Sequence, residues 1–194
     1  SRGEGQSPSV ALTGGLIDLR RRPDSGGSAG GKGPLTLSLD RVRIAPDLEL
    51  HGVRGTLLPR GVLTGTLTGT VNGQSPVTVD LAPLEGVQGI RVTSADAGGV
   101  FRSAKFVKSL RGGTLDLVLK NTASGVLDGS LSVSNARLVE TPAAVDLLSA
   151  ISIVGALDQM VNGGGLSLST IETRLSVSPK GVRLRDGIAN GPAL

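Results

Sequence analysis

The chain has 194 residues, a formal net charge of +4, no cysteine and one histidine, His51. This composition excludes disulfides and thiolate metal sites, and one histidine cannot build a multi-histidine metal centre. The length suffices for one domain with a sizeable core or for two small ones. The clearest basic cluster, Arg20 to Arg22, has no aromatic neighbour that would stack on bases. We therefore expect no nucleic-acid partner, and a solvated loop or contact with anionic headgroups for this cluster.

The first half of the chain is a succession of short apolar segments separated by turn residues. Residues 1–34 predict a flexible segment with one weak strand and a Gly/Ser-rich loop. Residues 35–94 predict an antiparallel meander, in which Asn72-Gly73 is a strong hairpin signal. A change of apolar parity predicts a bulge near Asp40-Arg41. The expected strands are 35–45, 48–58, 62–71, 76–81 and 87–94.

Along these strands leucine and valine alternate with threonine, serine and arginine, which predicts one apolar face and one wet face. Glycines recur inside the strands, and glycine tolerates bends and the close approach of another backbone. The predicted fold is therefore mainly β with two helices. Its centre is a curled antiparallel sheet that forms a groove or resembles an open barrel.

The first predicted helix covers residues 95–110, with Ser94 or Asp96 as its cap and Phe101 and Phe106 as its anchors in the core. Arg111-Gly112-Gly113 is expected to be a turn. Strands are then predicted over 114–121, 126–139, 166–178 and 182–188, with a register shift near Thr170.

The longest predicted helix is Pro142–Asn162. Thr141 caps it, Pro142 suits its first position, and the glycines after Asn162 end it. The helix is apolar over more than half of its circumference, so we expect it to pack against the sheet or to cap it. The alternative is a helix that closes an apolar groove or touches lipid. Asp146 and Asp158 argue against a membrane span.

The second half of the chain contains seven short segments whose order and spacing are distinctive. They are LRGGTLD at 110–116, GSLSV at 129–133, NARLV at 135–139, PA at 142–143, LLS at 147–149, VRLRDG at 182–187 and NGPAL at 190–194. Together they resemble the C-terminal region of the AsmA-like family, found in AsmA- and YhdP-type proteins of Gram-negative bacteria. TamB-type proteins are more distant relatives. The resemblance covers residues 95–194, which we treat as one module that continues the sheet of residues 35–94.

The resemblance implies a periplasmic section of a longer protein that is anchored in the inner membrane outside this sequence. Such proteins resemble bridge-like lipid-transfer proteins, whose curled sheets carry an apolar groove for acyl chains. The expected partners are phospholipid or another acyl-chain lipid, a membrane reached through the full-length protein, and proteins of the envelope. The implied role is phospholipid transport between the two membranes and homeostasis of the outer membrane.

The candidate groove lining consists of strand positions with aliphatic side chains, which shelter acyl chains without directional groups. It comprises Leu35, Leu37, Leu39, Leu63, Leu67, Val77, Val79, Leu115, Leu117 and Leu119. The alternative is a non-catalytic docking module, with a fully packed sheet whose edges bind partner strands in outer-membrane protein assembly or envelope organisation. An enzyme is not expected, because the sequence offers no nucleophile arrangement, metal cluster, phosphate loop or paired carboxylates. We expect neither a cofactor nor a metal.

Overall fold

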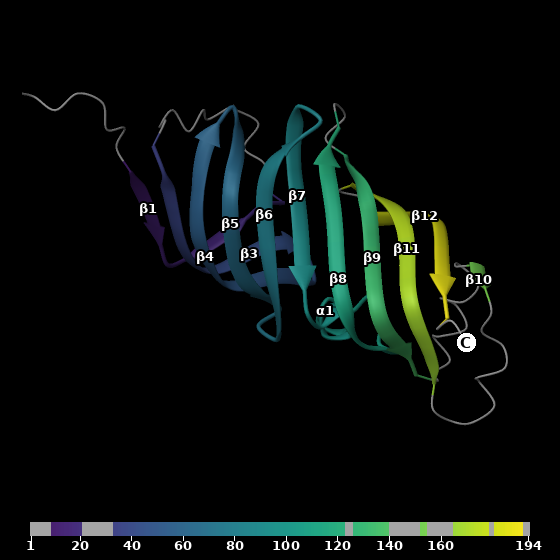
Figure 1. Cartoon of the computed structure of the whole chain (residues 1–194). Coiled ribbons are helices and arrows are strands. Elements are labelled where there is room, and N and C mark those ends of the chain that lie inside the picture. The colour runs from purple at the N-terminus through teal and green to yellow at the C-terminus, as the bar shows by residue number, and fades with distance from the viewer. Residues whose placement is uncertain are drawn as a thin grey trace, which may run out of the picture.

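The computed structural model describes residues 9–20, 33–122, 126–139, 152–154, 165–178 and 181–191. These residues form a 12-stranded sheet and one short helix, α1 (Ala97–Ser103). Figure 1 shows the strands side by side in nearly sequential order. They are β1 (Val10–Thr13), β2 (Leu16–Asp18), β3 (Leu35–Ala45), β4 (Leu48–Arg60), β5 (Val62–Val71), β6 (Ser75–Leu84), β7 (Val87–Ser94), β8 (Leu110–Asn121), β9 (Leu127–Leu138), β10 (Ser152–Val154), β11 (Leu166–Ser178) and β12 (Gly181–Asn190).

The sheet is open, with β1 at one end of the strand order and β10 at the other. From β3 to β9, and on through β11 to β12, every neighbouring pair is antiparallel. The short strands at the margins differ, because β1 and β2 pair with β3 in parallel and β10 pairs with β12 in parallel. The predicted mainly-β, curled and open sheet is confirmed.

The two faces of the sheet differ in chemistry as the alternation predicts. Pairing registers align one apolar cross-strand row, namely Leu37, Gly55, Leu67, Val79, Val92, Leu117 and Leu131. One residue further along each strand, on the opposite face, the aligned row is Ser38, Arg54, Thr68, Thr78, Thr93, Asp116 and Ser132. We call these two sides the apolar face and the polar face.

Two glycines of the apolar face allow neighbouring strands to approach closely. Gly55 and Gly65 have φ angles of +152° and +138°. A Cβ added to Gly55 would lie 2.1 Å from the Thr66 carbonyl oxygen and 2.9 Å from Leu67 Cδ2. A Cβ on Gly65 would lie 2.2 Å from the Thr56 oxygen and 3.2 Å from Leu57 Cδ2. Leucine side chains of adjacent strands therefore lie over glycines, which lets this part of the sheet curl.

The strands also bend, without losing their pairing register. In β11 the buried side changes from Leu168 to Ile171, yet its register with β9 continues unbroken. The bend coincides with left-handed backbone at Gly112, Gly113 and Asn135 in the neighbouring strands. The register shift predicted near Thr170 is therefore wrong. The β11–β12 shift falls between Glu172 and Arg174 instead.

The bulge predicted near Asp40-Arg41 is also wrong in position. The β3–β4 register is the same on both sides of Asp40, and its shift falls between Arg43 and Ala45. The apolar positions do change parity near Asp40 and near Thr170. The strands accommodate these changes by bending, which moves side chains to the other face without an inserted residue.

Three hydrophobic clusters of the described residues hold the sheet together. The first joins β8, β9 and β11 with α1, through residues such as Leu115, Val133 and Leu166. The second lies at β3 and β4 around Leu37 and Leu57. The third lies at the α1 end of β5 and β6, where Val71 and Val77 meet Ala104. Helix α1 lies against the apolar face near the ends of β7 and β8 (Figure 1).

The first predicted helix is shorter than expected. Asp96 caps α1 by accepting a hydrogen bond from the Gly99 N–H at 2.8 Å, as one of the two predicted caps. The helix ends at Ser103, and Lys105 has a left-handed φ of +59°. Residues 111–113 belong to β8 rather than to a turn. Phe101 packs against the first cluster, but Phe106 is 60% exposed, so its predicted role as a core anchor is wrong.

The long helix predicted over residues 142–162 is wrong for the part that the structure describes. Ser152–Val154 forms β10, paired in parallel with Ile188–Asn190 of β12. Ile153 and Val154 are β-branched, and an edge strand offers unpaired backbone groups that helical periodicity takes no account of. The other residues of the predicted helix lie outside the described residues.

Replacing Gly65 by alanine tests the close approach of β4 and β5. Gly65→Ala should destabilise the chain by about 2–5 kcal/mol, because it combines a strained φ with overlap at the Thr56 oxygen. The measurement is urea unfolding followed by circular dichroism. Gly61→Ala is the matched control, because Gly61 has a φ of +80° and open space around it. The control should lose only about 1–2 kcal/mol, and equal losses for the two variants would contradict the steric argument.

Candidate functional site

The aliphatic residues predicted to line a groove all lie on the apolar face. Registers place Leu37, Leu67, Val79 and Leu117 in one cross-strand row. The remaining candidates fall in parallel rows at spacings of two residues along their strands, on the same side of the sheet. These are Leu35, Leu39, Leu63, Val77, Leu115 and Leu119.

Burial divides these candidates into three groups. One group is buried in the packed face of the sheet, namely Leu37, Leu39, Val77, Leu115 and Leu119. A second group is half-buried and consists of Leu35, Leu67, Val79 and Leu117. Leu63 is 39% exposed near the start of β5. Only the half-buried and exposed residues present surface to a ligand while the described structure stays as it is.

A strip of the apolar face between the clusters is the best candidate site. Val79 of β6, Ile90 of β7 and Leu117 of β8 are half-buried and belong to none of the hydrophobic clusters formed by described residues. They lie on the adjacent strands β6, β7 and β8. Val79 and Leu117 both pair with Val92 of β7, which packs against the third cluster, and Ile90 lies two residues before Val92 on the same face. We call Val79, Ile90 and Leu117 the central strip. Leu67 and Leu81 border it on one side, and Leu131 borders it on the other.

Ile90, Leu81 and Leu131 are residues of this region that the sequence analysis left out of the groove lining. The signal that would have found them is the same period-two alternation, extended through every strand of the meander. Alternation alone does not tell which apolar residues join a hydrophobic cluster and which belong to the central strip. That depends on where α1 and the curl of the sheet bring side chains together.

The chemistry of the central strip is apolar and undirected. Its side chains are aliphatic, and the strip with its borders extends from β5 to β9, roughly 19 Å at about 4.8 Å per strand. Such a surface favours a ligand that loses apolar area from water, at about 0.8 kcal/mol per CH₂ buried. It offers no convergent donors or acceptors for a polar substrate.

The polar face is held by cross-strand charge pairs. Arg91 donates from Nε to Asp116 Oδ1 at 2.9 Å and from its terminal nitrogen to Oδ2 at 2.6 Å. This bidentate pair lowers the pKa of Asp116 below its ordinary value. Thr66 donates to Asp80 at 2.6 Å on the same face. These contacts stabilise the register of the central strands rather than form a binding pocket.

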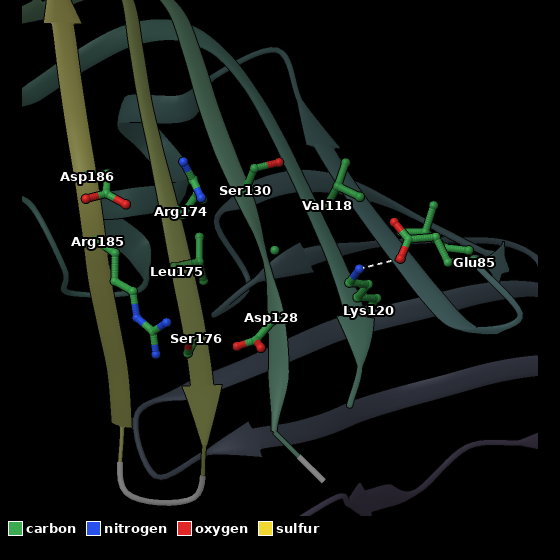
Figure 2. Close-up of a pocket in the computed structure, with 12 residues that line it drawn as sticks. Glu85, Val118, Lys120, Asp128, Ser130, Arg174, Leu175, Ser176, Arg185 and Asp186 are labelled. Carbon is green, nitrogen blue, oxygen red and sulfur yellow. Dashed lines mark hydrogen bonds and ion pairs between the residues drawn. The ribbon is translucent and has the colours of Figure 1, made fainter. Parts of the chain in front are cut away.

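A hollow of about 420 Å³ opens on the polar face over β8, β9, β11 and β12, and Figure 2 shows its lining. Lys120 pairs with Glu85, as the dashed line indicates. Arg174 and Arg185 stand directly opposite each other in the β11–β12 register, a like-charge arrangement that opposes pairing. Asp128 and Asp186 also line the hollow, so its positive and negative side chains balance. The hollow therefore selects neither an anion nor a cation.

No protein-family model, curated protein or solved structure matches this chain. Within the part of the chain that the structure describes, no group of three or more His, Asp or Glu side chains is placed to hold a metal ion. No helix among the described residues has the length and apolar character needed to cross a bilayer.

Removing the carboxylate of Asp116 tests the charge pair of the polar face. Its pKa is lowered in the folded chain, so the pair stabilises the fold above the unfolded pKa of about 3.9 and ceases to do so as pH falls through the folded value. Asp116→Asn should lower the free energy of unfolding by up to about 1 kcal/mol at pH 7, since the pair is largely exposed. The difference from the unaltered chain should shrink as the pH falls below the ordinary pKa of an aspartate and disappear below the lowered pKa of the folded chain.

The matched control for this pair is Arg91→Gln, with the double variant completing the cycle. The double variant should lose no more than about the larger single loss, because the two side chains act as one pair. Additive losses would mean that each side chain stabilises the sheet separately.

Proposed function

We propose that this chain is a lipid-handling section of an AsmA-like protein, in which the central strip shelters acyl chains. The observation that carries the proposal is the position of Val79, Ile90 and Leu117. They are aliphatic, half-buried and outside the hydrophobic clusters of the described residues. An aliphatic chain laid along the strip would remove this surface from water.

The open form of the sheet supports access to the strip. Its marginal strands β1 and β10 lie at opposite ends of the strand order, so the apolar face is not enclosed by a continuous ring of strands. A lipid would enter from the side and keep its headgroup in solvent. This entry needs no rearrangement of the buried residues Leu37 and Leu115.

The resemblance of residues 95–194 to the AsmA-like family supplies the wider setting of the proposal. In that setting the chain lies in the periplasm, attached to the inner membrane through another part of the protein. It moves phospholipid between the inner and outer membranes and contributes to outer-membrane homeostasis. Envelope proteins are the expected macromolecular partners.

A second candidate function is docking of a partner strand at β12. Among the described residues, β10 pairs only with Ile188–Asn190, so the outer edge of residues 181–187 has no strand beside it. Val182 and Leu184 of this edge are 47% and 48% exposed. An added strand would bond the free backbone groups and cover both side chains. This favours an envelope-assembly module as the alternative.

The proposal predicts that lipid co-purifies with the chain and is lost when the central strip is charged. Native mass spectrometry and lipid extraction measure lipid per chain. Val79→Asp and Leu117→Asp should each reduce bound lipid at least tenfold, because a carboxylate in contact with an acyl chain is poorly solvated. Thr78→Asp is the matched control, because Thr78 is the neighbour of Val79 on the polar face. The control should keep its lipid.

Circular dichroism checks that every variant is folded. Each variant must give the spectrum of the unaltered chain, so that a loss of lipid does not reflect a loss of fold. A folded chain with no lipid, or equal retention by Val79→Asp and Thr78→Asp, would contradict the acyl-chain proposal. Either result would favour the alternative function, docking of a partner strand at β12. Leu184→Pro removes a backbone N–H from β12. If this variant no longer binds an added β-strand peptide, that edge is the docking site.

A further inference from the structure

The turn between α1 and β8 displays an aromatic side chain to solvent. Phe106 is 60% exposed, more than any other large hydrophobic residue that the structure describes. It is also one of only two aromatic residues in the chain. An isolated exposed leucine needs no explanation in a soluble protein, but the most exposed apolar side chain being one of two phenylalanines does.

Backbone hydrogen bonds fix the course of the chain at Phe106. The Phe101 carbonyl oxygen accepts from the Phe106 N–H at 2.9 Å and from the Val107 N–H at 3.5 Å. Phe101 and Val107, which precede and follow Phe106 in the sequence, pack against the first cluster. Arg102 donates to the Leu110 carbonyl oxygen at 2.8 Å and ties α1 to the start of β8. The position of Phe106 is thus fixed by the fold.

Four cations surround Phe106 in the sequence, and no acidic residue interrupts them. They are Arg102, Lys105, Lys108 and Arg111, all exposed. One acidic side chain approaches from another element, where Asp47 lies 3.3 Å from Lys105 in a pair that is 73% and 67% exposed. Such an exposed pair contributes little, so the turn keeps a clear positive excess.

We propose that this basic-aromatic turn, residues 102–111, docks the α1 end of the sheet onto an anionic lipid bilayer. The phenylalanine ring enters the boundary between headgroups and acyl chains, where the Trp, Phe and Leu side chains of surface-bound segments insert. The lysine and arginine side chains lie along the surface, with their stems among the headgroups and their charges at the phosphates. The partner is an anionic bilayer surface rather than a single soluble lipid.

Charge complementarity selects the bilayer over a protein partner. A stable protein interface buries about 800 Å² on each side around a packed apolar centre, and charged residues are depleted there. A single exposed ring flanked in the sequence by four cations fits that pattern poorly. A bilayer needs no matched shape, and its negative surface gains from each lysine or arginine that reaches it.

This inference stands apart from acyl-chain binding on the central strip, which involves other side chains. Vesicle binding through the turn and lipid retention by the strip are separate measurements. A chain that docks without carrying lipid, or carries lipid without docking, would separate the two proposals.

The absence of tryptophan and tyrosine makes a direct test available. Phe106→Trp places a single fluorescent probe at the exposed ring. Its emission should shift to shorter wavelength on adding vesicles of phosphatidylglycerol and phosphatidylcholine, and brominated acyl chains should quench it. Val87→Trp is the matched control, because Val87 is 38% exposed at the opposite end of β7. Its emission should stay unchanged.

Charge variants test the electrostatic part of the contact. Lys105→Gln and Lys108→Gln should each weaken binding to the anionic vesicles about fivefold, and about 25-fold together. Arg60→Gln, an exposed position at the far end of β4, should change binding less than twofold. Raising the salt concentration should weaken the unaltered chain in the same direction.

Several results would overturn the docking proposal. An unshifted Phe106→Trp spectrum with vesicles, or equal shifts for Phe106→Trp and Val87→Trp, would do so. Binding that Lys105→Gln and Lys108→Gln leave unchanged would exclude the electrostatic contact. A shift that appears without vesicles and grows with protein concentration would identify a second copy of the chain as the partner.

Discussion

The close approach of leucine side chains over Gly55 and Gly65 is the constraint on which the rest of the structure depends. A side chain at either position would meet a backbone oxygen of the next strand at about 2 Å. With glycine there, β3 to β6 curl until Leu37, Leu57, Leu67 and Leu81 form one cluster without a covering helix. The helix α1 is then needed only at the other end of the apolar face, where it completes the first and third clusters.

The central strip exists because the curl and α1 cover different parts of the apolar face. One cluster is closed by the curl and the others by α1, and Val79, Ile90 and Leu117 lie between them. A sheet that covered these residues with its own side chains would be more stable. Here they remain partly accessible to a ligand. On the polar face, Arg91 pairs with Asp116 across two strands, and the charged side chains around the hollow balance. The proposed lipid site lies on the face of the sheet that α1 covers in part, and the proposed membrane contact lies at the end that α1 marks.

Alternation and glycine content were enough to predict the open curled sheet, its apolar face and most strand bounds. They were not enough to separate Leu115, which is buried, from Leu117, which is half-buried, because both alternate identically in β8. Helical periodicity failed at Ile153 and Val154, where the edge of β12 takes up a strand. It also failed at Phe106, where Lys105 takes a left-handed backbone and ends the helical pattern. Contacts distant in sequence decided the conformation in β8 and β10, whereas at Phe106 the local hydrogen bonds to the Phe101 carbonyl oxygen replace the helical pattern.

The most direct test of the central strip is a methyl NMR experiment with a spin-labelled fatty acid. The nitroxide broadens methyl signals close to the bound acyl chain. The strip predicts early broadening of Val79, Ile90 and Leu117, while Val118, which follows Leu117 on the polar face, stays sharp. Broadening of Val118 before Leu117, or uniform broadening over both faces, would contradict an acyl-chain site on the apolar face.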